Sequence, residues 1–541
     1  MADTTPPPPG TVPLMQHEDT VGAMEFLLSP TPSSDPNEPL NWPTWRKVLN
    51  YGLVTVVTLA AFTNLSVQTV LWQPMSVDLK VTFSQLSNAQ SAQLAGLAVG
   101  CLFFIPFAIK YGRRPVYLLS TLILAASSWW TSRVDSYAEL IATSFITGLA
   151  GAINETAVQM TCDNQGFHNQ ISDLFFVHQR GAANGVYFIA VMCGSFLTPM
   201  GAGAQAVAQS WRWSYYSISI ALTVLFVVFV FFFEETKYTC PTQSTAVIDF
   251  NDLELPIEGH SQEQNEVKKM NSVDLAAIKS NAVGEVNIPM KSYRERHRLV
   301  TKSNESLWKT FILPVRVICL PHVAFTAIQF ASGVCWLVTM LQANAIVFSA
   351  PPYLFTPAGV GYMALGPFVG NVFGSIYGGV FADWLVVRLA RRNNGIYEPE
   401  MRLYPLFLST ITMAGGLIMY GTTAARGMHW IYPSIGGAFF AFGLGSNGGI
   451  AFTLVIDAYR ELTAESFVGI AFIRNAGAIG VPSAFVPWMT SMGLSNMFIT
   501  AGCVAFAVGS LFLPLLIWGK KIRIALAPRF RRLVDLHEKN K

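Results

Sequence analysis

Twelve apolar runs constrain the fold of this chain more than any other feature of its sequence. A hydrocarbon layer about 30 Å thick needs about 20 apolar helical residues to cross it. The runs lie at residues 48–71, 88–109, 115–131, 138–160, 182–206 and 213–233, and then at 316–348, 359–388, 403–424, 429–455, 467–491 and 494–518. Because backbone polar groups in lipid must bond within their own segment, we expect an all-α membrane protein with twelve transmembrane helices.

Composition agrees with a membrane protein and excludes several other classes. The chain is 52% hydrophobic and 12% charged, against about 25% charged in soluble domains. Its net charge of +3 and the lack of a clustered basic face argue against nucleic-acid binding. None of the seven cysteines lies in a CxxC pair, so we expect no metal site and no cofactor. The sequence has no GxxxxGK[ST] loop and no nucleophile–base arrangement, so we expect neither ATP hydrolysis nor an enzyme.

Basic residues predict the orientation of the chain. With the N-terminus inside, the inner connections carry Arg113 and Arg114 and then Arg391 and Arg392, while the outer connections carry few basic residues. Because Lys and Arg concentrate in cytoplasmic loops, both termini are expected in the cytoplasm. We expect a multi-pass protein of the cell membrane.

One long polar segment, residues 234–315, divides the twelve runs six and six. The predicted units are a disordered cytoplasmic tail at 1–47, an N-terminal half at 48–233, a cytoplasmic loop at 234–315, a C-terminal half at 316–519 and a basic cytoplasmic tail at 520–541. Two six-helix halves joined by a loop are typical of a transporter that rocks one bundle against the other.

Several short stretches give the chain a family resemblance. They are Asp35-Pro-Asn-Glu-Pro-Leu-Asn-Trp-Pro43, Tyr111-Gly-Arg-Arg-Pro115, Trp211-Arg-Trp213, Glu234-Glu-Thr-Lys-Tyr238, Tyr397-Glu-Pro-Glu-Met-Arg402 and Val455-Ile-Asp-Ala-Tyr-Arg460. The chain resembles the major facilitator superfamily over residues 35–525, and within it the fungal twelve-span drug:proton antiporters. The resemblance implies the major facilitator fold, a small-molecule substrate and alternating access.

The loop after the second run resembles the family pattern G-x-x-x-D-R-x-G-R-R. Gly112, Arg113 and Arg114 match it, and Gly379 and Asp383 match its counterpart in the second half. The resemblance implies that these residues gate the inner face, since arginines can bond helix ends and carboxylates. The alternative is that they are ordinary cytoplasmic arginines that only orient the chain.

Two glycine patterns predict close helix contacts. In the fifth run, Gly194, Pro199 and Gly203 match part of the antiporter motif G-x-x-x-G-P-x-x-G-G, whose presence in the family implies export. Proline kinks a helix and glycine lets a neighbour approach, which suits a hinge or a seal. In the eighth run, four-residue spacing forms one stripe that predicts close helix packing: Gly366, Gly370, Gly374 and Gly378.

Ionisable residues inside apolar runs are costly and therefore candidates for function. Glu155 in the fourth run is a candidate proton carrier, because desolvation would favour its protonated form. The alternative is a structural carboxylate, and a pair with Arg474 across the two halves is left open. Asp457 is nearer the end of its run, and we expect it to be hydrated.

Amide, aromatic and basic side chains in the runs are candidates for lining a substrate cavity, although most aromatics in a helical bundle only pack. The candidates are Gln68, Tyr187, Gln329, Trp336, Asn344, Asn371, Asn447 and Arg474. Apolar walls with a few polar groups suit an amphipathic organic solute. We predict proton-coupled efflux of drugs or secondary metabolites by a monomer in the lipid bilayer. The alternatives are an importer of organic cations such as polyamines and a membrane sensor or scaffold that transports nothing.

Overall fold

The first half of the chain forms a bundle of long helices. The computed structural model describes residues 10–13, 37, 39–156, 186–187, 189–236, 290, 292–301, 307–393 and 395–538. The helices before residue 240 are α1 (Thr44–Val70), α2 (Trp72–Asp78), α3 (Phe83–Tyr111), α4 (Arg113–Thr131), α5 (Tyr137–Thr156), the π-helix η2 (Cys193–Leu197), α8 (Thr198–Ala208) and α9 (Trp211–Phe232). The 3₁₀ turn η1 (Pro39–Asn41) precedes them.

The second half is helical in the same way. Its helices are α11 (Tyr293–Arg296), α12 (Leu307–Val317), α13 (Pro321–Val347), α14 (Pro357–Tyr362), α15 (Leu365–Ile376), the π-helix η4 (Tyr377–Phe381), α16 (Ala382–Arg392), α17 (Leu406–Ala425), α18 (Ile431–Ala458), α19 (Thr463–Ala478), α20 (Gly480–Gly509) and α21 (Phe512–Glu538). Two 3₁₀ turns, η5 (Pro399–Leu403) and η6 (Arg460–Leu462), connect some of them. A pair of two-residue strands, β1 (Val12–Pro13) and β2 (Ile396–Tyr397), completes the described elements.

Each predicted apolar run contains helix in the structure, and the all-α class is confirmed. The boundary between the last two runs falls at Gly493, where α20 breaks with φ +76°. Eight helical stretches of the described residues are long and apolar enough to cross a membrane, and the last of them covers Thr463–His537. The number of twelve crossings stays a prediction.

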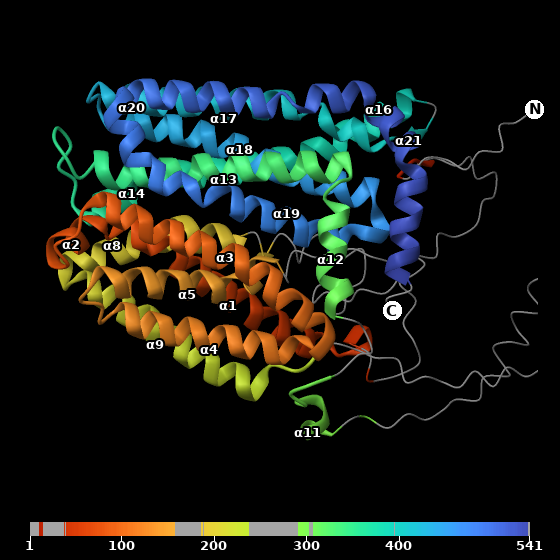
Figure 1. Cartoon of the computed structure of the whole chain (residues 1–541), viewed down its shortest axis with the longest axis horizontal. Coiled ribbons are helices and arrows are strands. Elements are labelled where there is room, and N and C mark those ends of the chain that lie inside the picture. Colours follow the sequence, from red (N-terminus) through yellow and green to blue (C-terminus); the bar gives the residue numbers. More distant parts are fainter. Residues whose placement is uncertain are drawn as a thin grey trace, which may run out of the picture.

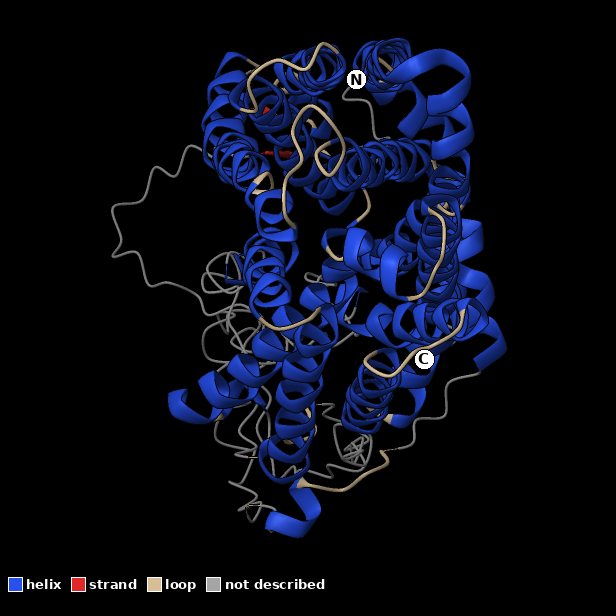
Figure 2. Cartoon of the chain, turned by 90° about the vertical axis from the view of Figure 1, so that its left-hand side faces the viewer, coloured by secondary structure: helices blue, strands red, loops and turns tan. Residues whose placement is uncertain are grey.

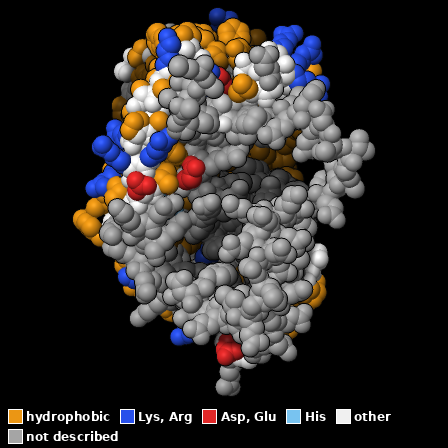
Figure 3. Space-filling model, turned by 90° about the vertical axis from the view of Figure 1, so that its right-hand side faces the viewer, with side chains coloured by type: hydrophobic (Ala, Val, Ile, Leu, Met, Phe, Trp, Pro, Cys, Tyr) orange, Lys and Arg blue, Asp and Glu red, His pale blue; other side chains and the backbone are white. Residues whose placement is uncertain are grey.

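The helices form two groups that face each other. Figure 1 shows α1–α9, coloured red to yellow, on one side and α13–α20, coloured green to blue, on the other. Figure 2 shows the molecule turned by 90°, with helices making up both groups. We call the end where α3, α16 and α21 finish the basic end. Figure 3 looks onto this end, where Lys and Arg side chains gather on the upper group.

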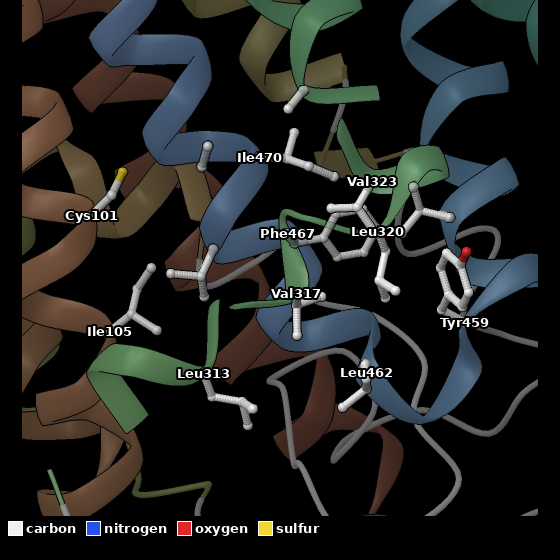
Figure 4. Packing of buried hydrophobic residues seen from close by; sticks show 14 of the residues in the cluster. Cys101, Ile105, Leu313, Val317, Leu320, Val323, Tyr459, Leu462, Phe467 and Ile470 are labelled. Atoms are coloured by element: carbon white, nitrogen blue, oxygen red, sulfur yellow. The ribbon is translucent and has the colours of Figure 1, made fainter. Parts of the chain in front are cut away.

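A buried apolar cluster joins the two groups near the basic end. Figure 4 shows Cys101 and Ile105 of α3 on one side of this cluster. Leu313 and Val317 of α12 and Phe467 of α19 lie with them. Since burial of apolar side chains is favourable without regard to direction, this cluster holds the groups together without fixing one orientation.

The C-terminal segment is helical where the sequence predicted only a basic tail. Residues 520–538 continue helix α21. Pro528 lies inside this helix, where proline removes a backbone hydrogen bond and favours a bend. Figure 1 shows the end of α21 turned across the basic end. Side-chain contacts anchor α21, among them the ion pairs of Arg523 with Glu400 and of Lys520 with Glu398, and the contact of His537 with Glu465.

The N-terminal segment also differs from its prediction at residues 10–13. These residues were expected to be disordered, but β1 pairs with β2 in antiparallel register. The pairing satisfies backbone groups that a disordered tail would leave to water. Residues 237–289, 291 and 302–306 of the predicted loop at 234–315, and most of the N-terminal tail, lie outside the described residues.

Candidate functional site

The predicted motif at residues 112–114 forms the start of α4. The backbone N–H groups of Arg113 and Arg114 donate to the two carboxylate oxygens of Glu235, both at 3.1 Å. The first N–H groups of a helix have no partner within the helix and attract anions. Glu235 therefore caps α4 from the segment that follows α9, which ties two helices together at the basic end.

The side chains around this cap add further bonds. Arg114 donates through Nη2 to the carbonyl oxygen of Val230 at 2.7 Å and through Nη1 to the carbonyl oxygen of His297. Arg46 at the start of α1 forms an ion pair with Glu234, with Nε and Oε2 2.9 Å apart. The basic end of the first half is thus held by two adjacent glutamates that the sequence showed only as part of a family stretch.

Gly112 is required by both its backbone and its surroundings. Its φ is +104°, and a Cβ at this position would lie 2.4 Å from Oε2 of Glu235. We expect Gly112→Ala to destabilise the protein by about 1–3 kcal/mol, because L side chains rarely adopt this conformation. The measurement is the unfolding temperature of the detergent-solubilised protein.

Gly52 in α1 provides the matched control, because a Cβ there would meet nothing within 4 Å. Gly52→Ala should leave the unfolding temperature unchanged or raise it slightly. Equal effects of the two substitutions would show that the Glu235 cap does not depend on Gly112.

The second half carries a different charge cluster at the same end. Arg402 of η5 binds Asp383 of α16, with Nη1 and Oδ1 2.6 Å apart, and also binds Asp457 of α18. The Tyr397 hydroxyl donates to Asp457 as well. Burial and the neighbouring Asp457 charge raise the pKa of the Tyr397 phenol, so it remains a hydrogen-bond donor.

The expected hydration of Asp457 is wrong. Its side chain is only 15% exposed, because η5 returns over the end of α18 and brings Arg402 onto the carboxylate. Asp383, predicted from the family pattern, has Arg402 as its partner. Gly379, the other predicted residue of this pattern, lies in the π-helix η4, and a Cβ there would meet nothing within 4 Å.

A second, more deeply buried cluster was missed by the sequence analysis. Arg523 of α21 donates to both oxygens of Glu400, from Nε at 2.8 Å and from Nη2 at 2.6 Å. His322 of α13 lies against the same carboxylate, with Nε2 3.5 Å from Oε1. Glu400 stood in the family stretch at 397–402, but no spacing rule connects it with residues 322 and 523.

The predicted antiporter motif lies between α1 and α14. Cβ atoms at Gly194 and Gly203 would lie 2.6 Å from the carbonyl oxygen of Leu59 and 2.5 Å from that of Pro357. Pro199 lies in the first turn of α8, directly after the π-helix η2. The two glycines therefore bring this segment against its own half on one side and against the second half on the other.

The predicted cavity residues are all buried, and most bond within their own half. In the first half, Gln68 Nε2 donates to Ser144 Oγ at 3.4 Å and the Tyr187 hydroxyl donates to the carbonyl oxygen of Asn154 at 3.2 Å. In the second half, Asn447 Nδ2 donates to Gln329 Oε1 at 3.1 Å and the Tyr420 hydroxyl donates to Asn344 Oδ1 at 2.6 Å. Trp336 donates to Ser332 and Asn371 accepts from Ser375. Their role in a cavity stays a prediction.

Glu155 lies in the last turn of α5, and its side chain is outside the described residues. Arg474 of α19 is buried and donates from Nε to Asn475 Oδ1 at 3.2 Å. The proton role of Glu155 and its pair with Arg474 therefore stay predictions.

Helix α3 makes polar contacts with the second half that the sequence analysis missed. Gln342 Nε2 of α13 donates to Gln90 Oε1 at 3.0 Å, and the hydroxyls of Ser91 and Ser483 lie 2.7 Å apart. Asn475 Nδ2 lies 3.7 Å from Cys101 Sγ. Polar residues inside the second apolar run were the available signal, but the sequence did not indicate which neighbour α3 would face.

Two facing groups of apolar helices, with charged clusters at one end and polar contacts between them, define a helical membrane transport protein. The chain belongs to the Major Facilitator Superfamily, whose model matches residues 54–482. Members of this superfamily are membrane transporters and not enzymes, so a membrane setting and a small-molecule substrate follow for this chain.

Similar proteins agree with this assignment over nearly the full chain. An MFS-type transporter of Schizosaccharomyces pombe is 27% identical over 98% of this chain and 95% of its own. Protein HOL1 of Saccharomyces cerevisiae is 25% identical over 95% of this chain and 92% of its own. The solved structure of peptide transporter POT in complex with sulfate has a TM-score of 0.55 at 15% identity, over 90% of this chain and 95% of that one, which supports the fold alone.

Proposed function

We propose that this transporter exports small amphipathic organic molecules in exchange for protons. The two halves rock against each other, so that a site between them faces first one side of the membrane and then the other. The basic end is the cytoplasmic end, and the protein works as a monomer in the cell membrane.

The contacts between the halves carry this proposal. The pairs Gln90–Gln342, Ser91–Ser483 and Cys101–Asn475 join uncharged groups, and Cys101 belongs to the apolar cluster that also contains Ile105 and Val317. Apolar walls with a few amide and hydroxyl groups suit a solute that is partly apolar and carries a few polar atoms. A strongly charged substrate would favour a site with several opposite charges.

The charge clusters at the basic end supply the gate in this proposal. Glu235 holds the start of α4, while Arg402 joins Asp383 to Asp457. Such charge-assisted bonds are directional and stabilise one arrangement of the helix ends. Each cluster lies within one half, so in this proposal it holds the helix ends of that half in the closed arrangement, and loss of its bonds shifts the balance toward the open state.

Glu155 is the proposed proton carrier. The test uses purified protein in liposomes with an imposed proton gradient, a panel of amphipathic dyes and drugs as probes, and labelled spermidine as a probe for cation import. We expect proton-driven movement of at least one amphipathic probe, and Glu155→Gln should abolish the response to the gradient because an amide cannot release a proton. Glu155→Asp should retain part of it.

Three results would overturn the proposal. Full proton-driven transport by Glu155→Gln would remove the proton role of this residue. Spermidine uptake without export of any amphipathic probe would favour an importer of organic cations. No flux of any solute across the panel would favour a sensor or scaffold.

A further inference from the structure

A short segment near the N-terminus docks on the second half of the protein. Residues 12 and 13 pair with β2 in antiparallel register, Val12 opposite Tyr397 and Pro13 opposite Ile396. The first half begins with α1 at Thr44, and Trp42 just before it is buried in the core of that half. The N-terminal segment therefore contacts the second half, although α1, the helix that follows it in the chain, belongs to the first half.

The residues before the strand fit this place closely. Gly10 has φ +81°, and a Cβ there would lie 2.6 Å from the carbonyl oxygen of Asp457 and 3.0 Å from Cγ of Pro399. Only glycine combines this backbone conformation with so little space. The hydroxyl of Thr11 accepts a hydrogen bond from Nη1 of Arg523 at 3.3 Å.

The docking place coincides with the two charge clusters of the second half. Strand β2 contains Tyr397, which bonds Asp457, and Arg523 binds Glu400 as well as Thr11. The segment thus contacts η5, the end of α18 and α21 at once. Figure 1 shows the short red strand beside α21 at the basic end, far along the sequence from the blue helix that it contacts.

We propose that residues 10–13 are a latch that holds the charge clusters of the second half closed and slows transport. The effect on transport rests on the proposed function, in which these clusters form the gate. The docking of residues 10–13 on the second half does not rest on it. A segment that binds one state only shifts the population toward that state. Loss of the latch should raise the frequency of opening about fivefold, the factor that corresponds to one typical net hydrogen bond.

Cross-linking tests the docking without any transport assay. Opposed residues of an antiparallel pair have Cβ atoms close enough for a disulfide. We expect Pro13→Cys with Ile396→Cys to form a disulfide under mild oxidation, detected as a linked peptide by mass spectrometry. Pro13→Cys with Val77→Cys, whose second cysteine lies on α2 in the first half, should link far more slowly, and Ile396→Cys alone reports any linkage to the native cysteines. Equal rates for the two pairs would overturn the docking.

Gly10→Val tests whether residues 10–13 stabilise the charge clusters of the second half. Its Cβ would collide with Asp457, so the segment should detach, and Pro7→Val is the matched control. We expect amide hydrogen exchange in residues 396–403 to become about fivefold faster in Gly10→Val only. Unchanged exchange would overturn the latch even if the cross-link forms.

Transport then separates the latch from the proposed function. With rhodamine 6G as the probe, Gly10→Val should carry it out of cells about fivefold faster than the Pro7→Val control. Faster exchange with unchanged export would show that the latch does not limit transport. Absence of export of rhodamine 6G and of every other amphipathic probe of the panel by the unmodified protein would count against the proposed function, while the cross-linking and exchange results would still decide the docking.

Discussion

Arg523→Ala should lower the free energy of unfolding by about 3–5 kcal/mol, because it leaves a buried carboxylate without its partner. Arg523 is 1% exposed and bonds both oxygens of Glu400, which is itself 5% exposed. Among the residues that the structure describes, His322 would then face the remaining charge. The measurement is thermal or denaturant unfolding of the protein in detergent, followed by intrinsic fluorescence.

A double variant distinguishes loss of the pair from loss of packing. Arg523→Met with Glu400→Gln removes both charges while keeping similar volumes, so it should cost less than Arg523→Ala alone. Arg388 provides a surface control, since it is an arginine of the same end that lies over the Trp384 ring. Arg388→Ala should change stability by less than about 1 kcal/mol. A similarly small effect of Arg523→Ala would show that Glu400 finds another partner.

Gly370→Leu should destabilise the second half by about 3 kcal/mol, at the upper end of the range for overpacked cores. A Cβ at Gly370 would lie 2.0 Å from the carbonyl oxygen of Ala438, so α15 and α18 would have to separate. Backbone atoms of α18 cannot move aside as a flexible side chain can. We expect a lower unfolding temperature and a smaller yield of monodisperse protein on size exclusion.

Gly379→Leu is the matched control in the same predicted membrane run. A Cβ at Gly379 would meet nothing within 4 Å, so leucine there should change the unfolding temperature little. If both substitutions destabilise equally, the close approach of α15 and α18 does not limit stability.

Helix positions and glycine contacts could be predicted from the sequence. The runs at 429–455 and 213–233 correspond to α18 (Ile431–Ala458) and α9 (Trp211–Phe232), because apolar composition and length determine a membrane helix. The stripe from Gly366 to Gly378 predicted close packing, and each of its glycines faces the backbone of α18. Local periodicity was sufficient for both features.

The partners of the charged residues could not be predicted in this way. Arg46 binds Glu234 and Arg523 binds Glu400, which are 188 and 123 residues apart. Such pairs depend on how helix ends meet in space, and hydropathy does not encode that. Asp457 illustrates the error, since its place near a helix end suggested water while η5 covers it with Arg402.

The candidate cavity was harder still. Gln329 and Asn447 were candidates for the cavity because each is a polar side chain in an apolar run. In the structure they bond each other within the second half. Gln90 and Ser91 have the same property and contact the other half. Residue type alone does not distinguish the two cases, because the facing direction on each helix decides between them.

The π-helix η4 has a consequence for the order of side chains along its span. A π turn accommodates one residue more than an α turn, and one residue of an α-helix corresponds to about 100° of rotation. The helix surface after residue 381 is therefore out of phase with the surface before residue 377. The glycine stripe that lies on α18 finishes at Gly378, and Asp383 beyond the π turn meets Arg402. One inserted residue thus lets the same span pack one face against α18 and direct another face toward Arg402.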